Sequence, residues 1–378
     1  MLRTGVDAHV RAEIARRGPI PFAEVVAAAL YLSDAGFYAT EGQAGRRGDF
    51  LTSPEVGPLF GAVIAGALDR WWVEAGSPAV FVVVEQGAGP GTLAAAVLHA
   101  QPRCAEALRY VLVEGSPRQR AAQAERLSLE YPSAAFATLP EPDDDAPSVA
   151  APPGPIVVSL GEPPRVPGPC IVIANELLDN LPFRLAEMTD AGWAEVHVGL
   201  AGDALVEVTL PLGSGDAALL HELVPGATTG ARVPLATEAA RWVRDARALA
   251  GPGGRVLAFD YAVPTAGLAE RPWTEWVRTY RRHQRGGHPL EGLGTQDITC
   301  EVPLDQLPAP ALDQAQAGWL RANGIDDLVA DARRTWDDRA AIGDLAAVRA
   351  RSRVHEAAAL LDSTGLGAFR AVEWTGTH

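Results

Sequence analysis

The residues with the clearest chemical potential lie in segment 80–92, which reads VFVVVEQGAGPGT. The β-branched apolar run at its start predicts a buried strand, and residues 92–100 predict a helix. Glycines in the turn between them let the backbone reach positive φ and approach a ligand, while the first turn of the helix offers free N–H groups. We therefore expect Glu85, Gly87, Ala88, Gly89 and Gly91 to form a nucleotide-binding cradle.

The spacing of these glycines narrows the choice of nucleotide. Thr92 stands where the dinucleotide pattern G-x-G-x-x-G needs its third glycine, and no Gly-Lys-Ser/Thr of a phosphate-binding loop follows. A compact G-x-G-x-G after an acidic residue suits S-adenosylmethionine (SAM), which presents an amine, a carboxylate and a ribose diol but no phosphate. The alternative is a tight strand–helix turn that binds no ligand.

A second acidic residue follows the next predicted strand. Residues 109–113 read RYVLV and end at Glu114, about twenty residues beyond the glycines. A carboxylate at this position can accept hydrogen bonds from both ribose hydroxyls. The alternative is a solvated glutamate at a strand end.

Further polar groups follow a later strand, in segment 171–182, which reads IVIANELLDNLP. Asn175 and Glu176 end this strand, and in doubly wound sheets the carboxyl ends of the strands face the ligand. Asparagine both donates and accepts hydrogen bonds, and glutamate can accept them from an amine or guanidinium. The alternative is that Asn175 caps a helix and Asp179 is solvated.

The elements that must position these residues divide the chain into four parts. Residues 1–75 predict mainly helices, at 6–17, 21–31 and 58–74. Residues 76–182 and 232–262 predict the strands and helices of a nucleotide-binding core. Residues 183–231 and 263–362 predict an insertion on the substrate side, with a β-ribbon at 183–210, an irregular segment at 263–300 and helix from 312 to 361. Residues 363–378 predict a C-terminal edge strand that returns to the core.

Composition limits the partners of the chain. Its 378 residues carry a formal charge of −15, which disfavours nucleic acid as a partner and favours a cationic one. No apolar run approaches the length of a membrane span and no secretory signal begins the sequence, so we expect a cytoplasmic protein. Three scattered cysteines give no zinc cluster, and we expect no metal.

Motifs along nearly the whole chain resemble the MidA-type family of SAM-dependent methyltransferases, bacterial relatives of the mitochondrial complex I assembly-factor arginine methyltransferase. These motifs are GPIPF (18–22), GDFLTSPE (48–55), EQGAGPGT (85–92), VLVEGSP (111–117), IANELLDNLP (173–182), AFDYA (258–262), YRRH (280–283), GTQDITCEV (294–302) and GLGAF (365–369). The resemblance implies an α/β fold: a Rossmann-like, seven-stranded class I methyltransferase core with an N-terminal helical extension and a substrate-side insertion. It also implies SAM as cofactor and a protein arginine, such as one of a respiratory complex I subunit, as methyl acceptor.

Within this resemblance, four residues are candidates for catalysis. Glu176, Asp260 and Asp297 could orient a nitrogen nucleophile and stabilise its charge, and His283 could act as a base. We expect the acceptor site between the core and the insertion, where these residues converge. The sequence departs from the family pattern at Ala262 and at residues 232–237, both on the substrate side.

The loop at 48–55 adds a prediction about the cofactor. We expect it to fold over the methionine end of SAM, with Thr52 or Glu55 in contact; the alternative is a surface loop tied to the N-terminal helices. Other functions stay open: transfer to a small molecule or peptide, a catalytically weak assembly factor, or an NAD-linked oxidoreductase. A homodimer is also possible.

Overall fold

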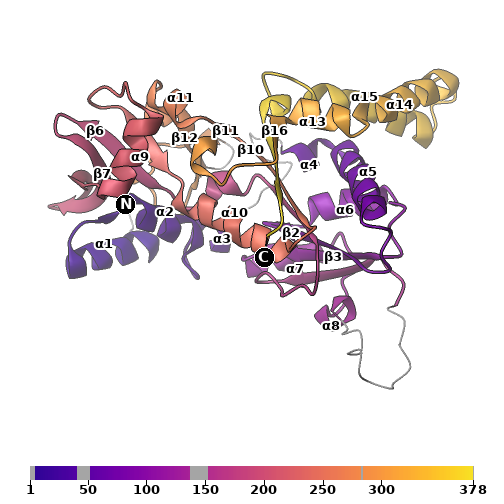
Figure 1. Cartoon of the computed structure of the whole chain (residues 1–378), viewed down its shortest axis with the longest axis horizontal. Coiled ribbons are helices and arrows are strands. Elements are labelled where there is room, and N and C mark those ends of the chain that lie inside the picture. The colour runs from indigo at the N-terminus through magenta and orange to yellow at the C-terminus, as the bar shows by residue number, and fades with distance from the viewer. Residues whose placement is uncertain (1–4, 41–51, 137–151, 282–283, 378) are drawn as a thin grey trace.

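The main sheet of the protein has seven strands. The computed structural model describes residues 5–40, 52–136, 152–281 and 284–377. The strand order is β16-β17-β10-β5-β2-β3-β4. Five strands of this sheet, β2, β3, β4, β5 and β10, are parallel to one another, and β17 is antiparallel to both of its neighbours (Figure 1). The strands span β2 (Phe81–Gln86), β3 (Leu108–Val113), β4 (Ile156–Leu160), β5 (Ile171–Asn175), β10 (Arg255–Asp260), β16 (Leu312–Ala315) and β17 (Arg370–Thr375). The predicted fold class is confirmed.

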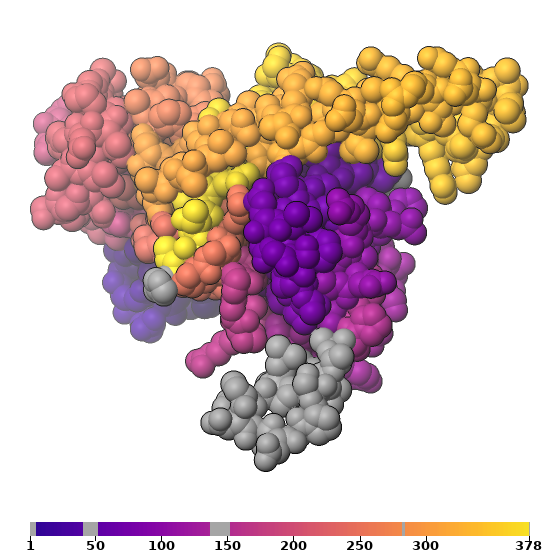
Figure 2. Space-filling view, turned by 45° about the vertical axis from the view of Figure 1, so that its right-hand side comes forward, coloured from indigo at the N-terminus to yellow at the C-terminus, as the bar shows by residue number. Residues whose placement is uncertain are grey.

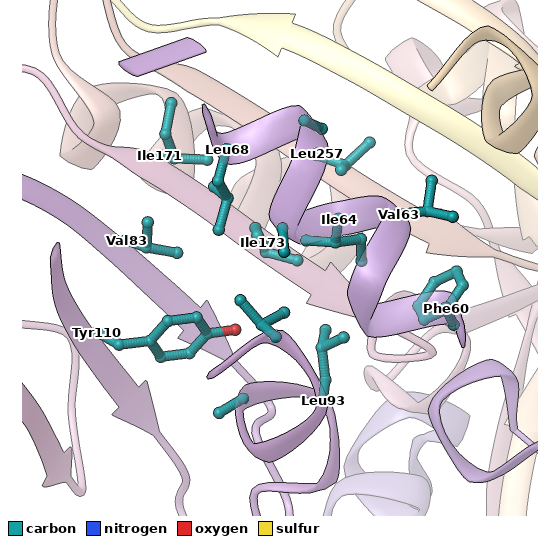
Figure 3. Packing of buried hydrophobic residues seen from close by; sticks show 14 of the residues in the cluster. Phe60, Val63, Ile64, Leu68, Val83, Leu93, Tyr110, Ile171, Ile173 and Leu257 are labelled. Carbon is teal, nitrogen blue, oxygen red and sulfur yellow. The ribbon is translucent and has the colours of Figure 1, made fainter. Parts of the chain in front are cut away.

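Helices cover both faces of this sheet. Alternate strand residues such as Val83, Ile173 and Leu257 pack against α5 (Pro58–Glu74) and α6 (Thr92–His99), as Figure 3 shows. The strand residues that point to the opposite face, such as Val84 and Val172, pack against α10 (Thr237–Ala250). Because both faces are buried, the parallel strands read as continuous apolar runs instead of alternating patterns.

A second, antiparallel sheet lies beside the core. It joins β6 (Arg184–Thr189), β7 (Gly192–Ala201), β8 (Ala204–Pro211), β9 (Arg232–Leu235) and the short β1 (Ile20–Pro21). The N-terminal helices α1 (Gly5–Arg17) and α2 (Phe22–Tyr31) share a buried cluster with β6 and β7, and α9 (Ser214–Leu223) packs through Leu220 in a separate cluster with β6, β7 and β9. Strand β9 corrects the sequence assignment: residues 232–235 were predicted to belong to the core but pair with β6.

Short elements surround the carboxyl ends of the core strands. The segment 263–300, expected to be irregular, contains two short helices and all three strands of a small sheet of order β13-β12-β14. The short elements of the structure, wherever they lie, are α3 (Phe37–Thr40), α4 (Ser53–Val56), α7 (Pro117–Gln123), α8 (Pro132–Ala135), η1 (Leu178–Asn180), β11 (Ala262–Val263), α11 (Thr265–Ala269), α12 (Trp273–Trp276), β12 (Val277–Arg281), β13 (Gln284–Arg285), β14 (Asp297–Cys300), β15 (Val302–Pro303), η2 (Leu304–Gln306) and η3 (Leu366–Ala368).

The C-terminal region differs from the prediction in two ways. Residues 312–315 were expected to begin a helix but form β16, so β16 is the edge strand and β17 lies inside the sheet. The helices α13 (Gln316–Ala322), α14 (Ile325–Arg339) and α15 (Leu345–Leu360) contribute to the core cluster, for example through Trp319, instead of belonging to a substrate-side insertion. They form a ridge along one side of the molecule (Figure 2). None of the described helices is both long and apolar enough to cross a membrane.

Candidate functional site

A cavity of about 890 Å³ opens where the core strands end. Strand β2 has β3 on one side and β5 on the other, so the chain reverses its direction of winding at this point, and the crevice there is the usual ligand site of such sheets. The lining comes from the carboxyl ends of β2, β3 and β5, the segment after β10, and the elements α3, α4, η1, β12 and β14.

The three glycines of the turn after β2 serve different purposes. All have positive φ, at +67° for Gly87, +52° for Gly89 and +78° for Gly91. A Cβ atom at Gly87 would lie 2.9 Å from Leu177 Cδ1, and one at Gly91 would lie 2.8 Å from Leu127 Cδ1. At Gly89, which lines the cavity, a Cβ atom would meet no atom within 4 Å. The space next to Gly89 is therefore available to a ligand.

Glu114 lies beside this open position. Its carboxylate accepts hydrogen bonds from Gly89 N at 2.9 Å and from Ser116 N at 2.8 Å. On the other side of the turn, Gln123 Nε2 donates to Gly89 O at 2.8 Å. The acid predicted to recognise a ribose is thus held against the glycine turn and also lines the cavity.

Glu85 lies beneath the turn. It is 4% exposed, and Tyr110, seen at the side of the cluster in Figure 3, donates its hydroxyl to the Glu85 carboxylate at 2.7 Å. Burial raises the pKa of Glu85 to about 8. The next residue, Gln86, also lines the cavity and accepts a hydrogen bond from Trp242 Nε1 at 2.8 Å. The sequence analysis selected neither residue: Gln86 lies inside the motif EQGAGPGT but was not assigned a role, and Trp242 lies on α10, far from that motif in the sequence.

The loop at 48–55 was predicted to fold over the cofactor. The structure describes its second half, 52–55, and residues 48–51 lie outside the described residues. Thr52 caps α4 in a capping box with Glu55, and both residues line the cavity. Ser53 lies between them, fully buried and hydrogen-bonded to the Gln316 side chain of α13. This bond joins the loop to the C-terminal part of the core.

Asn175 and Glu176 both lie on the cavity wall. Glu176 has a left-handed backbone with φ +51°, an uncommon conformation for glutamate and one often found at functional sites. Asn175 Nδ2 donates to Glu176 Oε1 at 3.2 Å, and among the described residues Asn175 Oδ1 has no hydrogen-bond partner. Burial, together with the charge of Asp260, raises the pKa of Glu176 to about 8, although the backbone N–H of Ser53 donates to its carboxylate.

Asp260 lies below the cavity wall and holds the neighbouring turn. It is 2% exposed, and its Oδ2 accepts from Leu177 N at 3.1 Å and Leu178 N at 2.7 Å. Its Oδ1 accepts from Tyr261 N at 2.9 Å. Burial raises the pKa of Asp260 to about 7, and the backbone donors oppose that rise. Asp260 was predicted to be catalytic; its carboxylate accepts hydrogen bonds from three backbone N–H groups, and Asp260 is not among the residues that line the cavity.

Asp297 lines the cavity from β14. Its Oδ1 accepts hydrogen bonds from the Tyr38 hydroxyl and from Asn180 Nδ2, both at 3.2 Å. The Tyr38 ring stacks on the Tyr31 ring with a centroid distance of 5.6 Å. Burial raises the pKa of Asp297 to about 6. The predicted base His283 lies outside the described residues.

Asp179, on η1, also lines the cavity, and sequence reasoning did not select it as a site residue. It is 5% exposed, and its Oδ1 has no hydrogen-bond partner within the part of the chain that the structure describes. Burial and the charges of Asp260, Glu176 and Asp297 raise its pKa well above the ordinary value. Its place in the motif NELLD, three residues after Glu176, was the available signal.

The charges on the lining favour a cationic ligand. Among the described lining residues Arg278 is the only lysine or arginine, and its guanidinium lies 2.6 Å from Glu301. The acidic side chains of the lining are Glu55, Glu85, Glu114, Glu176, Asp179, Asp297 and Glu301. These features fit SAM. The open turn at Gly89 leaves space for the ligand, the Glu114 carboxylate can accept from a ribose diol, and the excess of acids suits an amine and a sulfonium.

Comparisons with known proteins agree with this chemistry. The model of a family described as "Putative S-adenosyl-L-methionine-dependent methyltransferase" matches residues 63–322. The chain is 31% identical over 315 residues to the mitochondrial protein arginine methyltransferase NDUFAF7 homolog of Drosophila melanogaster, covering 78% of this chain and 67% of that protein. It is 27% identical over 331 residues to the NDUFAF7 protein of Danio rerio, covering 84% and 76%. A Burkholderia thailandensis crystal structure bound to S-adenosyl-homocysteine (SAH) superposes with a TM-score of 0.75 at 27% identity, covering 98% of this chain and 91% of that one.

Proposed function

The chain belongs to this family of SAM-dependent methyltransferases, and from that premise we propose that it methylates a cationic nitrogen, the guanidinium of a protein arginine. The observation that carries the proposal is the lining of the cavity, in which acidic side chains outnumber the single arginine. Guanidinium groups bind carboxylates in a planar, two-point geometry that several acids in one cavity can provide.

The cofactor side of the site belongs to the glycine turn. When bound, SAM supplies an electrophilic methyl group that a nucleophile attacks directly. We propose that Gly89 and Glu114 hold the cofactor, with Ala88 and the cap residues Thr52 and Glu55 also facing it. Gly87, Gly91 and Glu85 keep the turn in shape, because their surroundings are already filled by Leu177, Leu127 and Tyr110.

The acceptor side of the site belongs to the acids at the ends of β5 and β14. Glu176 and Asp297 line the same cavity, and both can accept hydrogen bonds from an arginine side chain and orient its nitrogen. Asp260 contributes indirectly, because it holds the turn that follows Glu176. The names of the curated relatives, protein arginine methyltransferases, support the same acceptor class. A respiratory complex I subunit is one such protein acceptor.

Labelling a cell lysate tests this function. The purified protein is incubated with lysate and SAM that carries a labelled methyl group, and labelled proteins are hydrolysed and searched for methylarginine. We expect methylarginine with the wild-type protein and none with Gly89→Val, which fills the space next to the turn. Label found only in small molecules would contradict a protein acceptor, and no label despite intact SAH binding would favour an assembly role without catalysis.

A further inference from the structure

We propose that Asp179 is the carboxylate that binds the cationic group of the methyl acceptor, an inference that rests on the proposed function. No other residue of the cavity combines deep burial, a carboxylate oxygen without a partner among the described residues, and a backbone held on both sides.

The backbone around Asp179 is fixed at both ends of its short turn. Before it, Leu177 N and Leu178 N donate to the buried carboxylate of Asp260. After it, the backbone oxygen of Asn180 accepts from the Tyr31 hydroxyl at 2.9 Å, and the Asn180 side chain donates from Nδ2 to Asp297 Oδ1 at 3.2 Å and to Ile298 O at 3.4 Å. A side chain held in this way is organised before the ligand arrives, which is what binding groups in an active site require.

Among the described residues of the cavity lining, the only lysine or arginine is Arg278, and its guanidinium is paired with Glu301 and not with Asp179. A buried carboxylate is costly unless it is paired with a cation or becomes protonated. The charges of Asp260, Glu176 and Asp297 all raise the pKa of Asp179. The charge of Asp179 in turn raises the pKa values of nearby weak acids, which are Tyr31, Tyr38, Tyr261, Tyr280 and Cys300. A cationic ligand would supply the missing partner.

Aromatic neighbours favour the acceptor over the cofactor as that ligand. The Tyr31 hydroxyl donates to Asn180 O at 2.9 Å, and the Tyr38 hydroxyl donates to Asp297, so the stacked pair of rings is attached to the residues that flank Asp179. Tyr31 is 44% exposed, which places this end of the cavity next to solvent. Tyr31 and Tyr38 line the same cavity as Asp179. Aromatic rings and a carboxylate in one cavity form a favourable site for a planar guanidinium on a side chain that enters from outside.

The test compares Asp179→Asn with Asp337→Asn, a matched change at an exposed position on α14. The acceptor is a degenerate peptide library with a central arginine, and the readouts are kcat/KM for methyl transfer, the Kd for SAH and the melting temperature. For Asp179→Asn we expect at least a hundredfold loss of kcat/KM with the SAH Kd within twofold of wild type. Its melting temperature should not fall, because a neutral group replaces a repelled acid. Asp337→Asn should match the wild type throughout.

Any one of the following results would overturn the inference. Asp179→Asn could transfer methyl groups at the wild-type rate, or it could lose SAH affinity and stability together, as a structural residue would. A wild-type protein that binds SAH but methylates no arginine peptide would contradict the proposed function as well, and so differs from a failure of Asp179 alone. If Asp179→Asn does not fold, Asp179→Glu keeps the charge but moves it; an unchanged KM in that variant would equally contradict the role.

Discussion

At the scale of single residues, Gly89 is the glycine of the turn after β2 whose substitution should affect ligand binding and not packing. Its neighbours Gly87 and Gly91 are small because other side chains crowd them, whereas a side chain at Gly89 would meet only the cavity. Gly89→Val should therefore weaken SAH binding by about a hundredfold, since it fills ligand space and strains a backbone at φ +52°. Calorimetric titration with SAH measures this loss.

A matched glycine provides the control for that change. Gly66 lies on the exposed face of α5, and no atom lies within 4 Å of a Cβ placed there. Gly66→Ala should leave SAH affinity unchanged and stabilise the helix by about 0.5–1 kcal/mol. Wild-type affinity in Gly89→Val would refute the position of the cofactor.

At the scale of elements, one side chain of α15 caps another helix. Glu356 is 7% exposed, and its Oε2 accepts from Leu59 N at 2.9 Å in the first turn of α5. Helix α4, which carries Glu55, ends directly before this point. Glu356→Ala should lower the free energy of unfolding by about 1–3 kcal/mol, because it leaves a buried helix N-terminus without its acceptor. Urea denaturation measures the change.

The same variant should also weaken SAH binding severalfold, because α4 lines the cavity. Ser352→Ala, on the exposed side of α15, is the control and should change stability by less than about 0.5 kcal/mol. If Glu356→Ala is as stable as the control, the contact between α15 and α5 contributes nothing to the fold.

At the scale of the whole molecule, buried acids should make stability depend on pH in an unusual direction. The pKa values of Glu85 and Glu176 are raised to about 8, that of Asp260 to about 7 and that of Asp297 to about 6. A raised pKa means that the folded state favours the protonated acid. This stabilisation is complete below the unfolded values near pH 4 and is lost as pH rises through the folded values.

We therefore expect the ligand-free protein to lose several kcal/mol of stability between pH 5 and pH 8, because each acid with a raised pKa makes stability fall as the pH approaches that pKa. Denaturant titrations at several pH values measure it. Glu176→Gln removes one of these acids and should reduce the slope. Stability that is constant or rises over this interval would show that the acids are ionised without penalty in the folded protein.

The sequence by itself determined the features that depend on neighbouring residues. A strand, three glycines and a helix lie within thirteen residues of one another, so the cradle could be predicted from local pattern alone. The positions of Glu114, Asn175 and Glu176 could be predicted as well, because each follows an apolar run and parallel strands present their carboxyl ends together. Residues 312–315 read LDQA and give no strand signal. They form β16 only because β17 provides an edge to pair with.

Only the tertiary structure decided which acids line the cavity. Asp260 and Asp179 both looked like polar residues after a strand, yet Asp260 binds the backbone of Leu177 and Leu178, more than eighty residues earlier, and Asp179 faces the cavity. The place of Asp179 in the motif NELLD marks it as a candidate, but its orientation and that of Asp260 depend on how distant segments pack. Local pattern therefore determined the glycine turn, and long-range packing determined which acids line the cavity.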